Sequence, residues 1–107
     1  MKVKSQVPSQ EVVVCFRALA DEWERETRFS SMVHEMVMHS AYQQIIGLGP
    51  VALPLIFKEL EAKGDWWFWA LTAITGEDVA KGTDTFDGAR QMWLDWGRKY
   101  GYLDSPD

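Results

Sequence analysis

The sequence has a single cysteine, Cys15, among its 107 residues. One cysteine excludes a disulfide within the chain and a cluster of thiolate ligands around a metal. Because Cys15 lies within the apolar run of residues 12–16, we expect its thiol to be buried. The sequence also has no apolar stretch of the ~20 residues that a membrane helix needs, and no signal-peptide pattern. These absences predict a cytoplasmic protein.

Positive charge is also scarce. Eleven Lys and Arg residues stand against sixteen Asp and Glu residues, which gives a formal net charge of −5. Proteins that bind nucleic acids use Lys and Arg to displace counterions from phosphates, and this chain has the opposite balance. We therefore expect no direct binding to nucleic acid. A basic protein is the partner that this charge favours.

No segment reads as a convincing β-strand, and apolar residues recur at helical spacing along most of the chain. A chain of 107 residues, 47% of them hydrophobic, fits one domain. The sequence predicts an all-α fold, a compact bundle of four to five helices. Residues 1–8 are predicted to be a polar lead-in and residues 104–107 a tail. Five helices are expected near residues 10–26, 41–46, 50–62, 66–75 and 85–100, and the mixed, Met-rich segment 32–38 favours one further short helical turn.

Capping and turn residues punctuate these helices. Ser9 is expected to cap the first helix, and Ser40 with Gln43 three residues later predicts a capping box. Gly97 lies inside the last helix, where glycine costs about 1 kcal/mol relative to alanine, so we expect another group to pack closely against it. The predicted buried stripe of this helix is Ala89, Met92, Trp93, Trp96 and Tyr100.

The most unusual stretch is residues 65–75, in which Trp66, Trp67, Phe68 and Trp69 follow one another. In a helix these side chains point to four different sides, so the helix has no polar face and must be enclosed by the fold or by a partner. Burying all four would remove roughly 600–1,000 Å² from water. Asp65 is expected to cap this helix and Gly76 to end it.

Residues 40–62 resemble one hairpin of the HEAT-repeat type. In that pattern a first helix ends at a Leu-Gly turn, here Leu48-Gly49, and a proline-led second helix follows from Pro50. The resemblance implies a central helical hairpin. It covers a single unit, which cannot form a solenoid by itself.

A wider set of motifs resembles a small, uncharacterised bacterial helical family. That resemblance implies a bacterial or mobile-element origin and carries no catalytic residues across. The motifs are Trp23 with Glu26-Thr27, Ile45-Ile46-Gly47, Trp67-Phe68-Trp69-Ala70-Leu71, Ile74-Thr75-Gly76-Glu77, and Trp93-Leu94 with Trp96-Gly97 before Gly101-Tyr102.

Residues that could carry chemistry do not form a recognisable motif. His34 and His39 are five residues apart and would lie about 140° apart on a helix, so they cannot share one metal ion. The loop of residues 77–84 has Val79 and Lys81 where a calcium loop needs oxygen ligands. We expect one exposed His and one beside the start of a helix, with no catalytic residue, metal or cofactor.

The aromatic excess has two interpretations. Helical spacing favours a core role for the tryptophans, but a small chain cannot easily cover one helix on every side. We therefore expect some aromatic residues to form a surface that anchors a partner, together with nearby carboxylates. The candidate partner-binding residues are Trp66, Trp67, Trp93, Trp96, Tyr102, Glu77 and Asp78.

The sequence favours a non-enzymatic protein-protein interaction module that binds one protein partner, such as an antitoxin, an immunity protein or an accessory subunit. The first alternative is a small-ligand-binding or catalytic subunit with a polar cleft near His39, Glu77 and Asp78. The second is a structural domain that associates with itself as a homo-oligomer.

Overall fold

Helices build most of the described chain, and the fold is all-α, as predicted. The structure is a computed structural model that describes residues 8–63 and 66–103. Most of the predicted lead-in and the whole predicted tail lie outside the described residues. The helices are α1 (Gln10–Thr27), α2 (Val33–Val37), α3 (Ser40–Leu48), the 3-10 helix η2 (Gly49–Ala52), α4 (Leu53–Ala62), α5 (Phe68–Thr75) and α6 (Phe86–Lys99).

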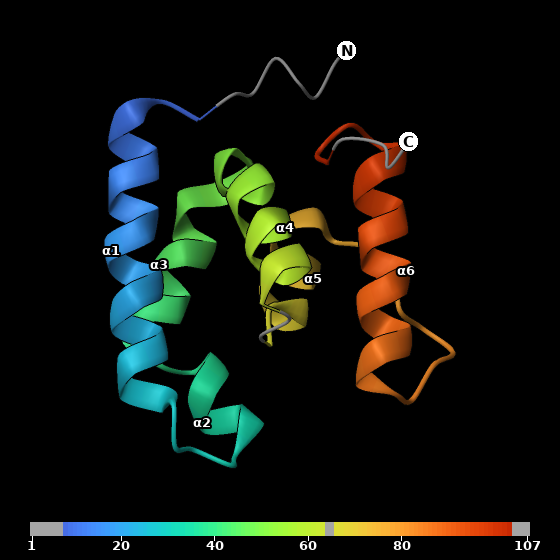
Figure 1. The fold of residues 1–107 in the computed structure, drawn as a ribbon, viewed down its shortest axis with the longest axis horizontal. Coiled ribbons are helices and arrows are strands. Elements are labelled where there is room, and N and C mark those ends of the chain that lie inside the picture. Colours follow the sequence, from blue (N-terminus) through green and yellow to red (C-terminus); the bar gives the residue numbers. More distant parts are fainter. Residues whose placement is uncertain (1–7, 64–65, 104–107) are drawn as a thin grey trace.

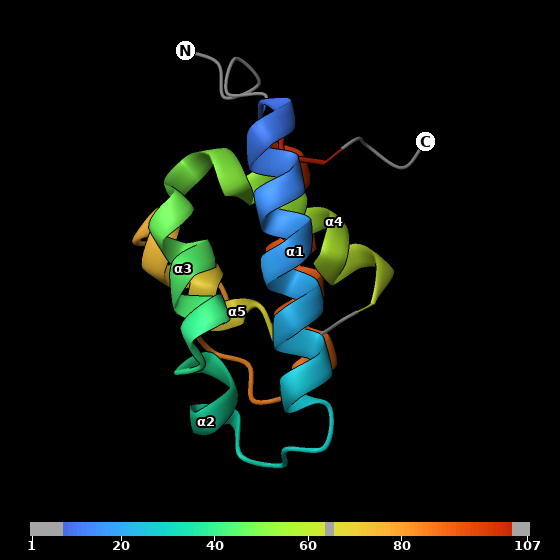
Figure 2. The ribbon, with the colours of Figure 1, turned by 90° about the vertical axis from the view of Figure 1, so that its left-hand side faces the viewer.

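Helices α1 and α6 stand on opposite sides of the molecule, with α3, α4 and α5 between them (Figure 1). Seen from the side of α1, helices α3 and α4 flank it, and the short α2 lies at one end near α3 (Figure 2). The chief partner of α1 is α3, and α4 packs equally against α6 and the adjoining η2. The radius of gyration is 13.3 Å, close to the ~13 Å expected of a single domain of this length.

Helix α1 begins where the sequence predicts. The Ser9 hydroxyl accepts a hydrogen bond from the backbone N–H of Val12, at 3.2 Å, and so caps the helix. Its buried face is formed by Phe16, Ala20 and Trp23. The prediction that Cys15 is buried is wrong, because the side chain next to Phe16 points about 100° away from that face, and the thiol is exposed.

Helix α3 begins with a different cap from the one predicted. The N-cap residue is His39, whose Nδ1 accepts a hydrogen bond of 3.0 Å from the backbone N–H of Ala41. Ser40 is the first helical residue, and the Gln43 side chain donates to the carbonyl oxygen of Val37 instead of closing a capping box. The predicted capping box is therefore wrong.

The connection from α3 to α4 follows the Gly-Pro signal. Gly49 ends α3 with φ of 79°, a left-handed angle that favours glycine. Pro50 then opens the tight turn of η2, and α4 begins at Leu53 with Pro54 in its first turn. Because the first helical positions need no N–H donor, neither proline breaks a hydrogen bond.

Trp67 is the centre of the core, although it precedes α5 instead of lying inside a longer aromatic helix. Its ring is fully buried, with centroids at 4.7 Å from Trp23, 5.5 Å from Tyr42 and 6.0 Å from Phe16. The indole N–H finds no hydrogen-bond acceptor among the described residues. Aromatic packing from α1 and α3 therefore fixes this residue, and α5 begins only at Phe68.

The hydroxyl of Tyr42 caps α5 from another helix. No side chain at the N-cap position of α5 does so, and the predicted cap, Asp65, lies outside the described residues. Tyr42 accepts a hydrogen bond of 2.9 Å from the backbone N–H of Ala70 and donates one of 3.0 Å to the carbonyl of Trp66. The Ala70 amide belongs to the first turn, whose N–H groups lack acceptors within the helix. Gly76 ends α5 in a left-handed conformation, as predicted.

Helix α6 packs on α4 through its glycine. A Cβ atom added at Gly97 would lie 2.9 Å from two ring atoms of Phe57, so the predicted close approach is confirmed. The buried side chains around it are Trp93 and Leu94. Met92 and Tyr100 are exposed, so the predicted buried stripe is wrong at those two positions.

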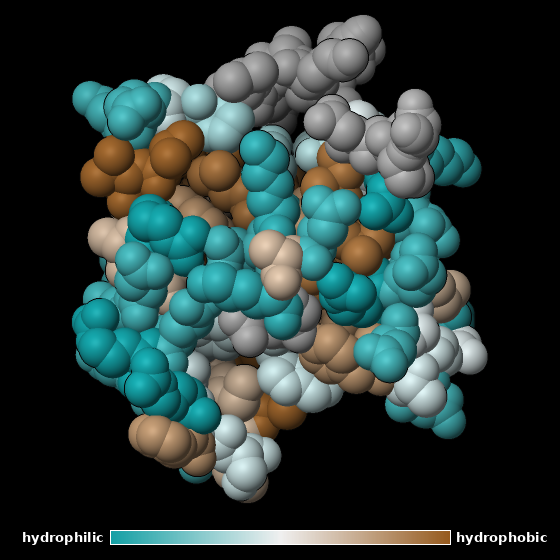
Figure 3. Space-filling model, viewed as in Figure 1, coloured by the Kyte–Doolittle hydropathy of each residue, from teal (hydrophilic) through white to brown (hydrophobic). Residues whose placement is uncertain are grey.

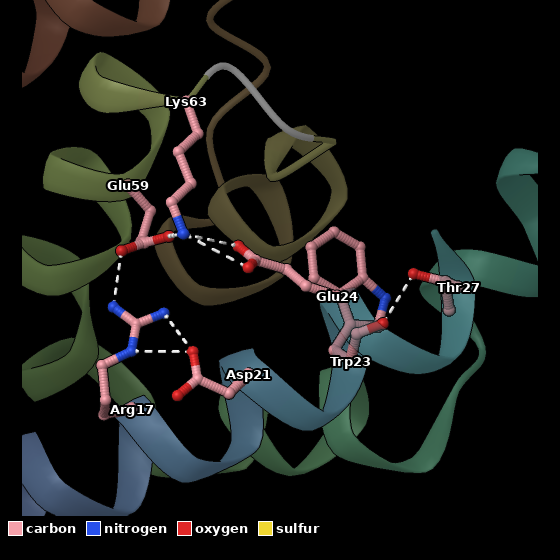
Figure 4. A network of polar contacts seen from close by, with 7 residues as sticks. All are labelled: Arg17, Asp21, Trp23, Glu24, Thr27, Glu59 and Lys63. Carbon is pink, nitrogen blue, oxygen red and sulfur yellow. Dashed lines mark hydrogen bonds and ion pairs between the residues drawn. The ribbon is translucent and has the colours of Figure 1, made fainter. Parts of the chain in front are cut away.

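Ion pairs join α1 to α4 (Figure 4). The Arg17 guanidinium lies between the carboxylates of Asp21, at 3.1 Å, and Glu59, at 2.7 Å. Lys63 in turn lies 3.2 Å from Glu24 and 3.7 Å from Glu59. The hydrogen bond with Glu59 is the largest effect that raises the pKa of Arg17. Buried Glu59 thus has a cation on each side, which offsets part of its desolvation cost.

Gly97 and Gly47 lie inside helices and predict opposite effects of alanine. Gly97→Ala should lower the free energy of unfolding by about 1–3 kcal/mol, because the new methyl group meets the Phe57 ring. Gly47→Ala should raise it by about 0.5–1 kcal/mol, because that position in α3 is open and alanine favours helix. Thermal and urea unfolding measure both variants. Equal effects of the two substitutions would contradict the packing of α6 on Phe57.

Removing the Tyr42 hydroxyl should destabilise the protein in a pH-dependent way. Tyr42→Phe leaves the buried Ala70 amide without an acceptor, at a cost of about 1–3 kcal/mol near neutral pH. Burial raises the pKa of Tyr42 above its ordinary value of 10.0. The folded chain then keeps a proton that the unfolded chain releases, so this contribution to stability falls as the pH rises above that value. Urea unfolding across this range should show the difference between wild type and Tyr42→Phe shrinking; a constant difference would contradict the assignment.

Candidate functional site

An open groove of about 530 Å³, which we call the α2–α5 groove, lies between α2, α5 and the start of α6. Helix α2 contributes one wall, with Val33, His34 and Val37 followed by Met38. The opposite wall is Trp66 with Phe68, Trp69 and Thr72 of α5. The groove is completed by Asp78, Ala80, Ala89 and Trp93.

The walls of the α2–α5 groove expose large apolar side chains. Trp69 is 57% exposed, Met38 53% and Trp66 37%. The space-filling view shows apolar residues emerging at the end of the molecule where α2 lies, and again beside the first turns of α1 (Figure 3). Trp66 and Trp69 thus remain partly exposed to solvent beside the groove, whereas Trp23, Trp67 and Trp93 are almost completely buried. Exposed tryptophans that cluster in this way are unusual on a monomeric protein.

Local structure explains why Trp66 and Trp69 face outward. The burial of Trp67 and the hydrogen bond from Tyr42 to the Trp66 carbonyl fix the backbone at the start of α5. Trp66 then packs edge-on against Phe86, with centroids 4.9 Å apart, while part of its ring remains in water. Trp69 follows two residues after the buried side chain and lies on the opposite side of the helix start.

The sequence-based site residues lie in different environments. Trp66 and Asp78 line the α2–α5 groove, and Trp93 lies buried at its base. Glu77 is exposed in the adjoining loop. Trp67 and Trp93 are 0% and 1% exposed, so the expectation that they anchor a partner at the surface is wrong.

Trp96 and Tyr102 belong to another aromatic cluster. Their rings stack with centroids 5.8 Å apart, and both stack on Phe57. Gly101 has φ of 86° and lets the chain fold back, so that the Tyr102 amide donates to the Gly97 carbonyl at 2.8 Å. These half-buried rings close the end of α6 over α4, which gives them a packing role.

Sequence reasoning missed Trp69, Met38 and Val33 as members of the groove. The signal for Trp69 is the run of four aromatics, but a run that is expected to be helical throughout does not show which of its members is exposed, and only Phe68 and Trp69 belong to α5. The signal for Met38 and Val33 was the Met-rich segment before α3. Methionine side chains adapt to irregular partners and are common at binding surfaces.

The two histidines take different roles. His34 is exposed at the α2–α5 groove, and His39 precedes α3, which confirms the expected exposed and helix-flanking positions. The sequence predicts a polar cleft near His39, Glu77 and Asp78, but only Asp78 of these three lines the α2–α5 groove. The Nε2 atom of His39 instead lies 2.7 Å from a carboxylate oxygen of Glu26 on α1. The groove has His34 and Asp78, and no hydrogen bond joins them among the described residues.

Glu22, Glu26 and His39 place ligand atoms within 4.8 Å of one another, a distance that suits a metal ion. The tautomer of His39 opposes this role. Because Nδ1 accepts the Ala41 amide hydrogen, the ring proton must lie on Nε2, where it donates to Glu26. A metal ion would need the lone pair of Nε2. Metal binding at Nε2 would therefore require loss of the hydrogen bond that caps α3. We interpret the cluster as a polar contact that connects α1 to the start of α3.

Comparisons with protein-family models, with curated proteins and with solved structures found no match. Within the described residues, no helix is both long and apolar enough to cross a membrane. The function must therefore be argued from the geometry and chemistry of the α2–α5 groove.

Proposed function

We propose that this chain is a non-enzymatic binding module that takes an apolar segment of a partner protein into the α2–α5 groove. The observation that carries the proposal is the exposure of Trp66, Trp69 and Met38 on facing walls of one groove. Tryptophan is enriched among the residues that contribute most to binding at protein interfaces. An immunity protein, antitoxin or accessory subunit would use such a surface, and the sequence resemblance to a bacterial helical family is consistent with that class of role.

The cost of exposing these side chains supports a binding role. A fully exposed aromatic side chain shows about 150–250 Å² to water, so Trp66 and Trp69 alone leave on the order of 150–250 Å² uncovered. Met38 and Val33 extend the apolar surface on the opposite wall. A continuous apolar patch of a few hundred Å² on a monomer often marks an interaction site.

A small apolar ligand is the second candidate for the same groove. Its volume of about 530 Å³ falls within the range of small-molecule sites, which is roughly 300–1,000 Å³. The groove is open, however, and its described polar groups, His34, Thr72 and Asp78, make no hydrogen bonds to one another that would prearrange a ligand site. A protein segment can cover an open groove more completely than a small molecule can.

A peptide-display selection against the full chain tests the proposed function. We expect the recovered peptides to be rich in apolar residues and to lose about tenfold or more of their affinity for Trp69→Ala. Val14→Ala is the matched control, because it also removes an exposed apolar side chain, on α1. Circular dichroism checks that both variants fold. Peptides that bind Trp69→Ala as well as wild type, or no enriched peptides, would contradict the proposed function.

A further inference from the structure

The elements around the α2–α5 groove carry an excess of negative charge. Residues 33–39 and 66–93, which include every residue that lines the groove, contain five carboxylates and two cations, Lys81 and Arg90. The Arg90 guanidinium donates to the backbone carbonyls of Leu60 and Glu61. The carboxylates are those of Glu35, Glu77, Asp78, Asp84 and Asp87, and all five residues are exposed. Asp78 itself lines the groove. The groove therefore combines apolar walls with Asp78 and with four further carboxylates on the segments that form it, which together we call its acidic border.

These five carboxylates make no ion pair with any other described residue. Several cations elsewhere in the described chain are engaged with other groups. Arg17 and Lys63 neutralise Glu59 and their neighbours (Figure 4), and Arg98 pairs with Glu61 at 3.0 Å. The negative charge at the groove border is thus left for a partner to neutralise.

The shape and surroundings of the groove favour a helix as its occupant. Helices and a connecting loop form its walls, and the described residues contain no strand whose edge could pair with an extended peptide. An amphipathic helix binds such a groove with its apolar face. A second copy of this chain is a poor occupant through the same face, because two acidic borders would be brought together.

We infer that the partner segment is a basic amphipathic helix whose apolar face covers Trp66, Trp69 and Met38 and whose Lys or Arg side chains meet the acidic border at Asp78. This inference rests on the proposed function and specifies its partner. Long cationic side chains suit both parts of the site, because their aliphatic stems lie on apolar surface and their charged ends reach carboxylates. Cations also interact favourably with tryptophan faces.

Designed peptides test the inference. Each is about 18 residues long, roughly five helical turns, with one leucine face and a polar face built from Lys, Gln or Glu. A scrambled Lys peptide of equal composition has no apolar face. Fluorescence anisotropy of labelled peptides measures affinity for the full chain. We expect the Lys peptide to bind about tenfold tighter than the Glu peptide, and the scrambled peptide to bind weakly.

Charge-removal variants locate the effect. Asp78→Asn with Asp84→Asn should reduce the preference for the Lys peptide by about threefold to tenfold, because Asp78 lines the groove and Asp84 lies in the same loop between α5 and α6. Glu11→Gln with Glu22→Gln is the matched control, since it removes two carboxylates of α1 that make no ion pair with described residues. Trp69→Ala should weaken all three amphipathic peptides alike.

The outcomes separate the two proposals. If the three amphipathic peptides bind equally and Trp69→Ala weakens each, the inference about basic charge is wrong and the proposed function stands. If the control pair lowers the preference as much as the groove pair, the attraction is unspecific and the inference is also overturned. If the binding of every designed helix is unaffected by Trp69→Ala, the inference that the groove binds a helix is wrong. The peptide-display selection then tests the proposed binding function independently.

Discussion

The burial of Trp67 together with the two hydrogen bonds of the Tyr42 hydroxyl is the constraint on which the rest of the structure depends. Trp67 contacts rings from α1 and α3, so this one residue joins the start of α5 to two helices that are distant in the sequence. Tyr42 supplies the acceptor that the first turn of α5 lacks in its own cap. Each aromatic pair contributes about 0.5–1.5 kcal/mol beyond the area it buries. Together, the burial of Trp67 and the hydrogen bonds of Tyr42 fix the position at which α5 begins.

That fixed start explains the surface as well as the core. With Trp67 inside, the neighbouring Trp66 lies at the edge, and Trp69 turns toward solvent across from Met38. The same packing that stabilises the fold therefore produces the exposed tryptophans of the α2–α5 groove. A partner that covers them would complete the enclosure that a helix without a polar face requires. The acidic border then favours a partner of opposite charge.

Much of the fold follows from local signals in the sequence. Ser9, Gly49, Pro50, Gly76 and Gly101 act where the helices begin, turn or end as their chemistry predicts, and Gly97 marks the close approach of Phe57. The errors arise where a distant residue decides the local outcome. Helix periodicity could not anticipate that aromatic rings from α1 and α3 would hold Trp67 outside the helix. The cap of α3 by His39 depends on a side chain that also reaches α1.

The candidate site was only partly predictable, for a related reason. Composition indicates the aromatic excess and the acidic charge. Of the residues that the sequence names as partner-binding, Trp66 and Asp78 line the α2–α5 groove and Glu77 is exposed next to Asp78. Whether a given tryptophan is buried depends on packing across helices distant in sequence, which the spacing of residues 66–69 cannot supply. The same limit applies to Cys15. Its neighbours in the sequence are apolar, but its side chain lies beside the buried face of α1 and is exposed.

Solvent accessibility of the six indole N–H groups reports how the chain is oriented at the start of α5. In a ¹H–¹⁵N spectrum, single Trp→Phe variants assign the six indole signals, and a soluble paramagnetic agent broadens those that solvent reaches. We expect little broadening for the buried Trp67 and Trp23. The Trp23 indole N–H also donates to the carbonyl oxygen of Met36 at 2.8 Å. We expect strong broadening for the exposed Trp69. A protected Trp69 or an accessible Trp67 would contradict this account, because α5 would then begin in a different orientation.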